Sequence, residues 1–202
     1  MDFLSIKTAG FSICFYMSDK FSNPWRTVES RQVYDNPWIR VRQDEVIRPD
    51  GEDGIYGVVH FKNRAIGVLP IDEEGYTYLV GQYRYPLNRY SWEIPEGGGP
   101  EDEEPLESAR RELREETGLE ARHWELLGHA HLSNSVTDEE ALYYLATGLV
   151  QLDAQPEGTE RLELMRVPFA EALRMVLDGE ITDALSVLAI MRYELKSRKV
   201  RN

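Results

Sequence analysis

GGGPEDEEPLESARRELREETGL, residues 97–119, gives the clearest indication of how this chain folds. Pro105 suits the first position of a helix and Gly118 suits the position just after its end. The stretch therefore predicts a helix from about Glu104 to Thr117, directly behind a glycine-rich turn that ends a strand. Apolar residues at helical spacing give this helix a stripe that packs against the rest of the protein, and they are Leu106, Ala109 and Leu113.

Three glutamates share one face of the predicted helix. At 100° per residue, Glu112, Glu115 and Glu116 occupy an arc of roughly 100°. Like charges at this spacing destabilise an isolated helix by about 0.2–0.5 kcal/mol per pair, and a bound divalent cation reverses the sign of that effect. Because the ligands are all oxygens, the pattern indicates Mg²⁺, with Mn²⁺ as the alternative. Arg111 lies four residues before Glu115 and is placed to pair with it and orient the acidic side chains.

The same stretch is similar to the Nudix box at every constrained position. The matching residues are Gly97, Glu103, Arg111, Glu112, Leu113, Glu115, Glu116, Gly118 and Leu119. The resemblance implies the Nudix fold, which is an α+β class α/β/α sandwich with a mixed central sheet, and a metal-dependent hydrolase. Without the matching residues on either side, the segment RELREE would indicate an ordinary solvated helix surface.

Two further stretches, QYR at residues 82–84 and WEIPEG at residues 92–97, resemble the ADP-ribose and nucleoside-diphosphate-sugar pyrophosphatase branch of that family. This resemblance extends from Asn23 onward. It implies a metal site made by the backbone carbonyl of Glu96 with the carboxylates of Glu112, Glu115 and Glu116. It also implies that Arg84 and Glu93 bind the substrate. The alternative for Arg84 is a surface residue that ends a strand.

The loop at residues 133–140, SNSVTDEE, occupies the place where these relatives carry a catalytic glutamate. Glu139 matches this catalytic glutamate best, and Glu140 is the alternative within the loop. The other candidate for the catalytic residue is a box glutamate, Glu115, with Arg111 beside it. A carboxylate on a loop opposite the metal helix can accept a proton from the attacking water. The alternative is that both loop glutamates are solvated charges. ADP-ribose enzymes usually carry a proline in this loop, where this chain has Asn134 and Ser135. The identity of the sugar in the substrate therefore stays open.

Trp25 and Trp38 each follow an Asn-Pro pair in the N-terminal region. The resemblance implies that aromatic residues of this region stack on a purine base, which is worth about 1–3 kcal/mol per base. Packing in the core or in a dimer interface is an equally good reading of a tryptophan.

Three parts of the chain are expected. Residues 1–16 form an extension that is disordered or not translated, since Met17 is a possible start; residues 17–62 form an antiparallel β appendage for dimerisation and base binding; residues 63–202 form the Nudix hydrolase domain. Strands alternate through the appendage and the first part of the domain, and two helices are expected near residues 169–180 and 184–198.

Composition excludes several classes of partner. A net charge of −13 disfavours a nucleic-acid backbone or an anionic membrane as the main partner. The four histidines lack the spacing of a zinc site, and the single cysteine, Cys14, excludes an internal disulfide and suits a cytoplasmic protein. We therefore expect a cytoplasmic homodimer that binds a small nucleoside diphosphate derivative.

The expected reaction is magnesium-dependent hydrolysis of ADP-ribose or a related nucleoside diphosphate sugar to a nucleoside monophosphate and a sugar phosphate. Two alternatives stay open. The chain could hydrolyse another nucleotide, such as a triphosphate or a dinucleotide, or it could sense a nucleotide sugar without cleaving it.

Overall fold

The computed structural model describes residues 22–152 and 162–201. The extension expected at residues 1–16 lies outside these described residues. Within the described part of the chain, no helix is long and apolar enough to cross a membrane.

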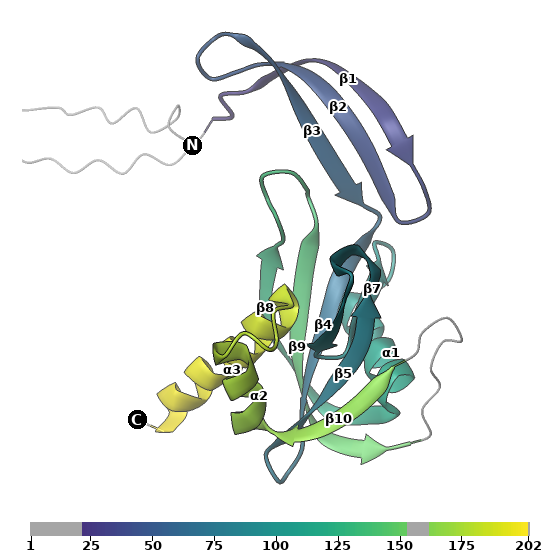
Figure 1. Cartoon of the computed structure of the whole chain (residues 1–202), viewed down its shortest axis with the longest axis vertical. Coiled ribbons are helices and arrows are strands. Elements are labelled where there is room, and N and C mark those ends of the chain that lie inside the picture. The colour runs from purple at the N-terminus through teal and green to yellow at the C-terminus, as the bar shows by residue number, and fades with distance from the viewer. Residues whose placement is uncertain (1–21, 153–161, 202) are drawn as a thin grey trace, which may run out of the picture.

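An antiparallel sheet of three strands forms the N-terminal part and lies above the rest of the molecule in Figure 1. Its strands are β1 (Arg26–Asp35), β2 (Ile39–Ile47) and β3 (Asp53–Phe61), paired in that order. Gly51, with φ at 90°, turns the chain between β2 and β3, a backbone conformation that glycine adopts without a steric cost. The expected antiparallel appendage is confirmed.

A second sheet of seven strands forms the centre of the molecule, with the path β10-β5-β4-β9-β8, while β6 pairs with β5 and β7 with β4. Pairing of β4 with β9 is parallel and the other pairs are antiparallel, so the sheet is mixed, as the resemblance implied. Its strands are β4 (Asn63–Ile71), β5 (Tyr76–Arg84), β6 (Arg89–Glu93), β7 (Glu96–Pro100), β8 (Leu119–His131), β9 (Glu140–Gln151) and β10 (Glu163–Pro168). A short 3₁₀ helix, η1 (Tyr85–Leu87), joins β5 to β6.

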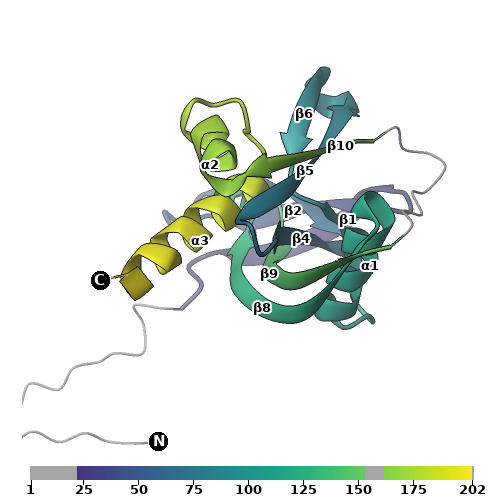
Figure 2. The same cartoon turned by 90° about the horizontal axis from the view of Figure 1, so that it is seen from below.

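Helices cover both faces of this sheet (Figures 1 and 2). Helix α1 (Pro105–Thr117) lies on one face, and α2 (Phe169–Leu177) and α3 (Ala184–Arg201) lie on the other. Strand β4 supplies both cores because successive side chains point to opposite faces: Ile66 packs with α1, and Leu69 packs with α2 and α3. This arrangement is the α/β/α sandwich expected from the box.

Helix α1 begins and ends close to the predicted residues. Glu104 is its N-cap, Pro105 opens it, and Gly118 closes it with φ at 69° and an N–H that donates to the Arg114 carbonyl oxygen at 2.9 Å. Ala109 and Leu113 are fully buried, so the predicted apolar stripe is confirmed.

The glycine run was assigned to a turn, and this prediction was wrong. Gly97, Gly98 and Gly99 lie inside strand β7, antiparallel to β4, and the turn lies earlier, between β6 and β7. Neighbouring groups fill the space that side chains would need: a Cβ on Gly98 would lie 2.8 Å from the Asn63 amide nitrogen, and one on Gly99 would lie 2.7 Å from Ile66. The glycines are therefore required by close packing rather than by a turn.

Candidate active site

The box glutamates line one polar cavity between α1 and β7. Its volume is about 330 Å³, and its lining is Trp38, Asn63, Glu96, Gly97, Gly98, Arg111, Glu112, Glu115, Glu116 and Leu162. The one-face arrangement predicted from helical periodicity therefore places all three carboxylates at the same cavity.

Arg111 holds two of these carboxylates in place. Its Nη1 donates to Glu112 Oε1 at 2.6 Å and to Glu115 Oε2 at 3.2 Å, and its Nη2 donates to the Gly98 carbonyl oxygen at 2.8 Å. Burial alone would lower the pKa of Arg111, but the nearby charges of Glu112 and Glu115 raise it, so the guanidinium stays protonated. These contacts fix the two carboxylates relative to each other and to β7, and the orienting role of this arginine stays a prediction.

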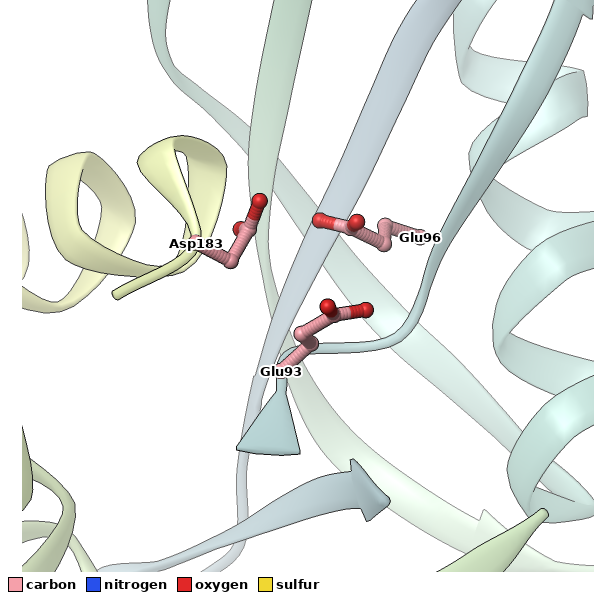
Figure 3. A group of neighbouring side chains, drawn as sticks. All are labelled: Glu93, Glu96 and Asp183. Carbon is pink, nitrogen blue, oxygen red and sulfur yellow. The ribbon is translucent and has the colours of Figure 1, made fainter. Parts of the chain in front are cut away.

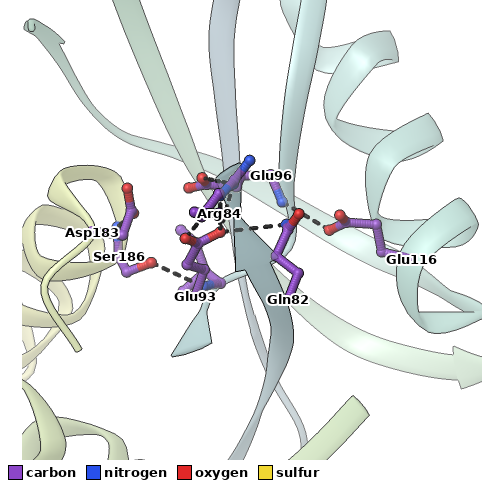
Figure 4. Close-up of polar contacts among 8 residues, drawn as sticks. Gln82, Arg84, Glu93, Glu96, Glu116, Asp183 and Ser186 are labelled. Atoms are coloured by element: carbon purple, nitrogen blue, oxygen red, sulfur yellow. Dashed lines mark hydrogen bonds and ion pairs between the residues drawn. The ribbon is translucent and has the colours of Figure 1, made fainter. Parts of the chain in front are cut away.

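Glu116 connects the helix to the turn between β6 and β7. Its Oε2 accepts a hydrogen bond from the backbone N–H of Glu96 at 2.9 Å (Figure 4). The residue whose carbonyl was expected to bind metal is therefore fixed relative to the helix that carries the metal carboxylates.

Gly97 leaves room for the carboxylate of Glu112. A Cβ at position 97 would lie 2.2 Å from Cδ of Glu112, and 2.3 and 2.4 Å from its two oxygens. The carboxylate therefore packs directly against the backbone of β7. Glu112 is accordingly buried, with only 8% of the residue exposed. The acidic residues of this lining are all glutamates, and carboxylate oxygens are ligands that Mg²⁺ and Mn²⁺ prefer, so these residues fit a hard divalent cation.

Gly97→Ala is expected to weaken Mn²⁺ binding by about 10- to 100-fold, because the new methyl group must displace the Glu112 carboxylate. Titration with Mn²⁺ followed by electron paramagnetic resonance measures this. Gly57→Ala is the matched control, since a Cβ there meets nothing within 4 Å in a strand of the other sheet. Unchanged Mn²⁺ affinity in Gly97→Ala would show that Glu112 does not bind the ion.

Arg84 lies beside this cavity and is held by two carboxylates (Figure 4). Its Nε donates to the Glu93 oxygens at 2.9 and 3.0 Å, and its Nη2 donates to Glu93 Oε2 at 2.5 Å and to Glu96 Oε1 at 2.7 Å. Burial alone would lower the pKa of Arg84, but Glu93 and Glu96 raise it. Within the described part of the chain, Nη1 has no hydrogen-bond acceptor, so this nitrogen is left for another partner.

Glu93 was expected to bind the substrate, but the structure places it beneath Arg84. Only 2% of Glu93 is exposed, and it lines neither the cavity of the box glutamates nor the second cavity described below. Both of its carboxylate oxygens accept hydrogen bonds from Arg84. Its position makes Glu93 a support for Arg84.

A compact acidic group lies next to Arg84 and includes a residue that sequence reasoning missed. Oxygens of Glu93, Glu96 and Asp183 lie within 4.8 Å of one another, and Figure 3 shows the three carboxylates pointing together. Among residues 22–152 and 162–201, no other set of three potential metal ligands is as compact, the box glutamates included. Arg84 already supplies a cation here, and burial, reinforced by Asp183 and Glu93, raises the pKa of Glu96 well above its usual range.

Asp183 belongs to the N-terminus of α3. Its Oδ2 accepts from the backbone N–H of Ser186 at 2.7 Å, and Ser186 Oγ accepts from the backbone N–H of Ile94 at 2.9 Å. This capping arrangement is visible in the sequence as an aspartate directly before an apolar helical run, but the contact with the β6–β7 turn is not.

A second cavity, of about 410 Å³, adjoins the first. The two cavities share Trp38, Asn63, Glu96, Gly97 and Gly98; the second adds Phe61, Arg64, Ala65, Gln82, Arg84, Glu139 and Leu185. They therefore form one groove, with the box carboxylates on one side and Arg84 and Glu139 on the other.

The two loop glutamates occupy different surroundings. Glu139 lines the second cavity, and burial raises its pKa. Glu140 instead lies 3.3 Å from Arg64 Nε and 3.1 Å from His129 Nε2, so its carboxylate is already engaged. The geometry favours Glu139 over Glu140 for contact with a molecule in the groove.

The two tryptophans, Trp25 and Trp38, also lie in different surroundings. Trp38 lines both cavities and is 68% exposed. Trp25 lines neither of them, and its ring packs edge-on against Tyr56 with a centroid distance of 5.3 Å. In this chain, Trp38 is the tryptophan that a bound molecule can reach.

Comparison with known proteins identifies two family matches that divide the chain near residue 60. The nucleoside diphosphate sugar hydrolase N-terminal domain matches residues 25–59, and the NUDIX domain matches residues 61–186. The chain is 33% identical over 175 residues to an ADP-ribose pyrophosphatase of Mycobacterium tuberculosis, covering 83% of this chain and 82% of that protein. It is 32% identical over 173 residues to an ADP-ribose pyrophosphatase of Bacillus subtilis, covering 85% and 93%.

A solved structure has a similar fold. A crystal structure described as an ADP compounds hydrolase superposes with a TM-score of 0.75 at 21% sequence identity, covering 86% of this chain and 95% of that one. At this identity the likeness concerns the fold, and it agrees with the layers described above.

Proposed function

The chain belongs to the Nudix hydrolase family, and from this membership we propose that it hydrolyses the diphosphate bond of ADP-ribose or a related nucleoside diphosphate sugar with the help of Mg²⁺. The products are a nucleoside monophosphate and a sugar phosphate. One observation carries the proposal: the groove has a carboxylate face beside a face with Arg84 and Glu139. A diphosphate fits between a cation-binding face and an arginine.

The metal-holding residues in this proposal are the carboxylates of Glu112, Glu115 and Glu116 and the backbone carbonyl of Glu96. A bound divalent cation neutralises diphosphate charge and lowers the pKa of a coordinated water. The hydrogen bond from the Glu96 N–H to Glu116 keeps the turn and the helix at a constant separation. Arg111 keeps Glu112 and Glu115 turned toward the cavity.

Arg84 lines the second cavity and binds the diphosphate through its guanidinium group. Its Nε and Nη2 are held by Glu93 and Glu96, so the guanidinium is oriented before substrate arrives, and Nη1 is left for a phosphate oxygen. An arginine held in this way loses little side-chain entropy on binding.

Glu139 is the proposed general base. It accepts a proton from the water that attacks one phosphorus; the new phosphorus–oxygen bond forms as the bond to the bridging oxygen breaks, and that oxygen leaves with its electron pair on the second phosphate. Its place in the lining and its raised pKa support this role, while Glu140 is engaged by Arg64 and His129.

The names of the relatives and the chemistry of the groove together favour ADP-ribose as the substrate to try first. The purified protein is incubated with Mg²⁺ and, separately, ADP-ribose, GDP-mannose, ADP-glucose, NADH and dGTP, and the products are identified by mass. We expect AMP and ribose 5-phosphate from ADP-ribose, and no product in excess chelator. Cleavage of dGTP or NADH alone would assign a different Nudix substrate, and tight binding without cleavage would indicate a sensor.

Trp38→Ala is expected to raise KM for the nucleotide sugar, corresponding to a loss of about 1–3 kcal/mol of stacking, with a smaller effect on kcat. The reason is its exposed position at both cavities. Trp25→Ala is the matched control, because Trp25 lines neither cavity and packs on Tyr56. Steady-state kinetics of both variants distinguish the two; a larger rise in KM for Trp25→Ala would assign base stacking to the other tryptophan.

Homodimerisation through the β1–β2–β3 sheet is also proposed. All ten residues of β1 are exposed in the single chain, including Val28, Val33 and Tyr34, and β1 is an edge strand whose unpaired backbone groups can pair with a second copy. Light scattering that shows only monomer at micromolar concentration would rule this out.

A further inference from the structure

The loop between β8 and β9 is hydrogen bonded to strand β3 of the N-terminal sheet. The backbone N–H of Val59 donates to the Val136 carbonyl oxygen at 2.9 Å, and the N–H of Asp138 donates to the Val59 carbonyl oxygen at 3.4 Å. Val59 and Thr137 form an isolated parallel bridge. In Figure 1, this loop is at the end of the β8–β9 hairpin nearest the β1–β2–β3 sheet. The contact joins the two sheets at the loop that carries the proposed general base.

Two side chains of β3 reinforce the same contact. The hydroxyl of Tyr56 donates to the Ser135 carbonyl oxygen at 2.8 Å, and His60 Nδ1 lies 2.9 Å from Asp138 Oδ2. Tyr56 and His60 are four residues apart on one strand, so their side chains point to the same face. One residue holds the middle of the loop and the other holds the position directly before Glu139.

Within the loop, Glu139 is tied to its neighbours. Its backbone N–H donates to Thr137 Oγ1 at 3.0 Å, and its carbonyl oxygen accepts from the Leu132 N–H at 3.2 Å. Ser133 has φ at 47°, a left-handed conformation that is uncommon for a residue with a side chain. A displacement of residues 135–138 is therefore passed directly to Glu139.

We propose that Tyr56 and His60 are positioning residues for the hydrolysis: through the loop at residues 133–138, they set the location of the Glu139 carboxylate in the groove. This inference rests on the proposed function, in which Glu139 takes the proton from water. It gives the N-terminal sheet a role in the chemical step, separate from dimerisation and base binding. Misplacing a catalytic group by about 1 Å lowers the rate strongly, whereas substrate affinity depends on other contacts.

The test compares Tyr56→Phe, His60→Ala and the double variant with the full-length protein. Each single variant loses one hydrogen bond at the protein surface, and we expect kcat to fall about fivefold, with a fall of about 20-fold in the double variant. KM, Mn²⁺ affinity and Tm stay within twofold or a few degrees of the parent values, because neither residue lines the groove. His60→Asn, whose amide replaces Nδ1, restores most of the rate.

Tyr90→Phe is the matched control. It removes a tyrosine hydroxyl that donates to Glu163 Oε2 at 3.0 Å, a hydrogen bond between β6 and β10 that lies outside the loop contact and outside the lining of the groove. We expect kcat of this variant to equal that of the parent protein. Hydrogen exchange of a peptide spanning residues 132–140 provides a second measurement, and it should be faster in the Tyr56→Phe/His60→Ala variant than in the parent protein and unchanged in the control.

A double-mutant cycle separates the two proposals. If the β3 residues act through Glu139, then Tyr56→Phe has no further effect on kcat in the Glu139→Gln background, although it lowers kcat fivefold in the parent. Suppose that Glu139→Gln is inactive while Tyr56→Phe and His60→Ala both keep the native kcat. This result overturns the positioning role of the two β3 residues and leaves the proposed function standing. Near-native kcat in Glu139→Gln overturns the base assignment and this inference with it. Equal, additive losses in both backgrounds show a general structural effect and also overturn the inference.

Discussion

Replacing Glu116 with glutamine lowers kcat by about 10³-fold, the largest loss expected from any single change in the groove. Glu116 has two roles in this site. Its carboxylate is one of the proposed metal ligands, and its Oε2 accepts the hydrogen bond from the Glu96 N–H that fixes the β6–β7 turn. The glutamine side chain keeps the size and one oxygen acceptor, so the turn stays in place while the negative charge that attracts the cation is lost.

Glu107→Gln is the matched control for this variant. Glu107 lies on the same helix, but it is exposed and pairs with Arg110 on the solvent side. We expect its kcat to equal that of the parent, because surface ion pairs contribute about 0–1 kcal/mol or less. Both kcat and Mn²⁺ affinity are measured for the two variants at saturating substrate. A Glu116→Gln enzyme with native kcat and native Mn²⁺ affinity would remove this residue from the metal site.

Replacing Glu139 with glutamine lowers kcat by about 10²-fold, at the low end of what a general base contributes, with little change in KM. Glu140→Gln is the control that decides between the two loop carboxylates. Glu140 is held by Arg64 and His129 and should tolerate the change without loss of kcat. A large loss in Glu140→Gln with a near-native Glu139→Gln would reverse the assignment.

The pH dependence of kcat gives an independent measurement of Glu139. The base must be ionised, and burial raises its pKa above the ordinary glutamate value of 4.5. Activity is therefore complete above the raised pKa and is lost as the pH falls through it, at a higher pH than an ordinary glutamate would produce. Measured at saturating Mg²⁺, this acidic limb is present in the parent and absent from the residual activity of Glu139→Gln. An identical limb in both proteins would assign it to another group.

Much of the architecture could be predicted from local patterns. The bounds of α1 were within one residue, because proline, glycine and the apolar stripe act over a few positions of the chain. Alternation of polar and apolar residues likewise located the strands of the appendage and those that precede the box. The glycine run was the exception. Gly97 lies in a strand because β7 pairs with β4, and it lacks a side chain where Glu112 packs against it, so both contacts involve residues on other elements.

The site divides in the same way. Helix α1, the face shared by Glu112, Glu115 and Glu116, and the pairing of Arg111 with Glu115 all follow from the amino-acid sequence, because residues three and four apart on a helix are neighbours whatever surrounds them. The family membership follows from the same short-range spacing. Periodicity and spacing were sufficient for these features because they depend on contacts within one helix.

Which groups meet in the groove depends on the packing of distant segments. This packing put Glu93 under Arg84, brought Asp183 to the β6–β7 turn, and turned Glu139 toward the cavity while Glu140 joined Arg64 and His129. It also chose Trp38 over Trp25, and it docked the β8–β9 loop on β3. These contacts join segments that are far apart in the chain, and their geometry depends on how two sheets and three helices pack, which no local pattern of residues encodes.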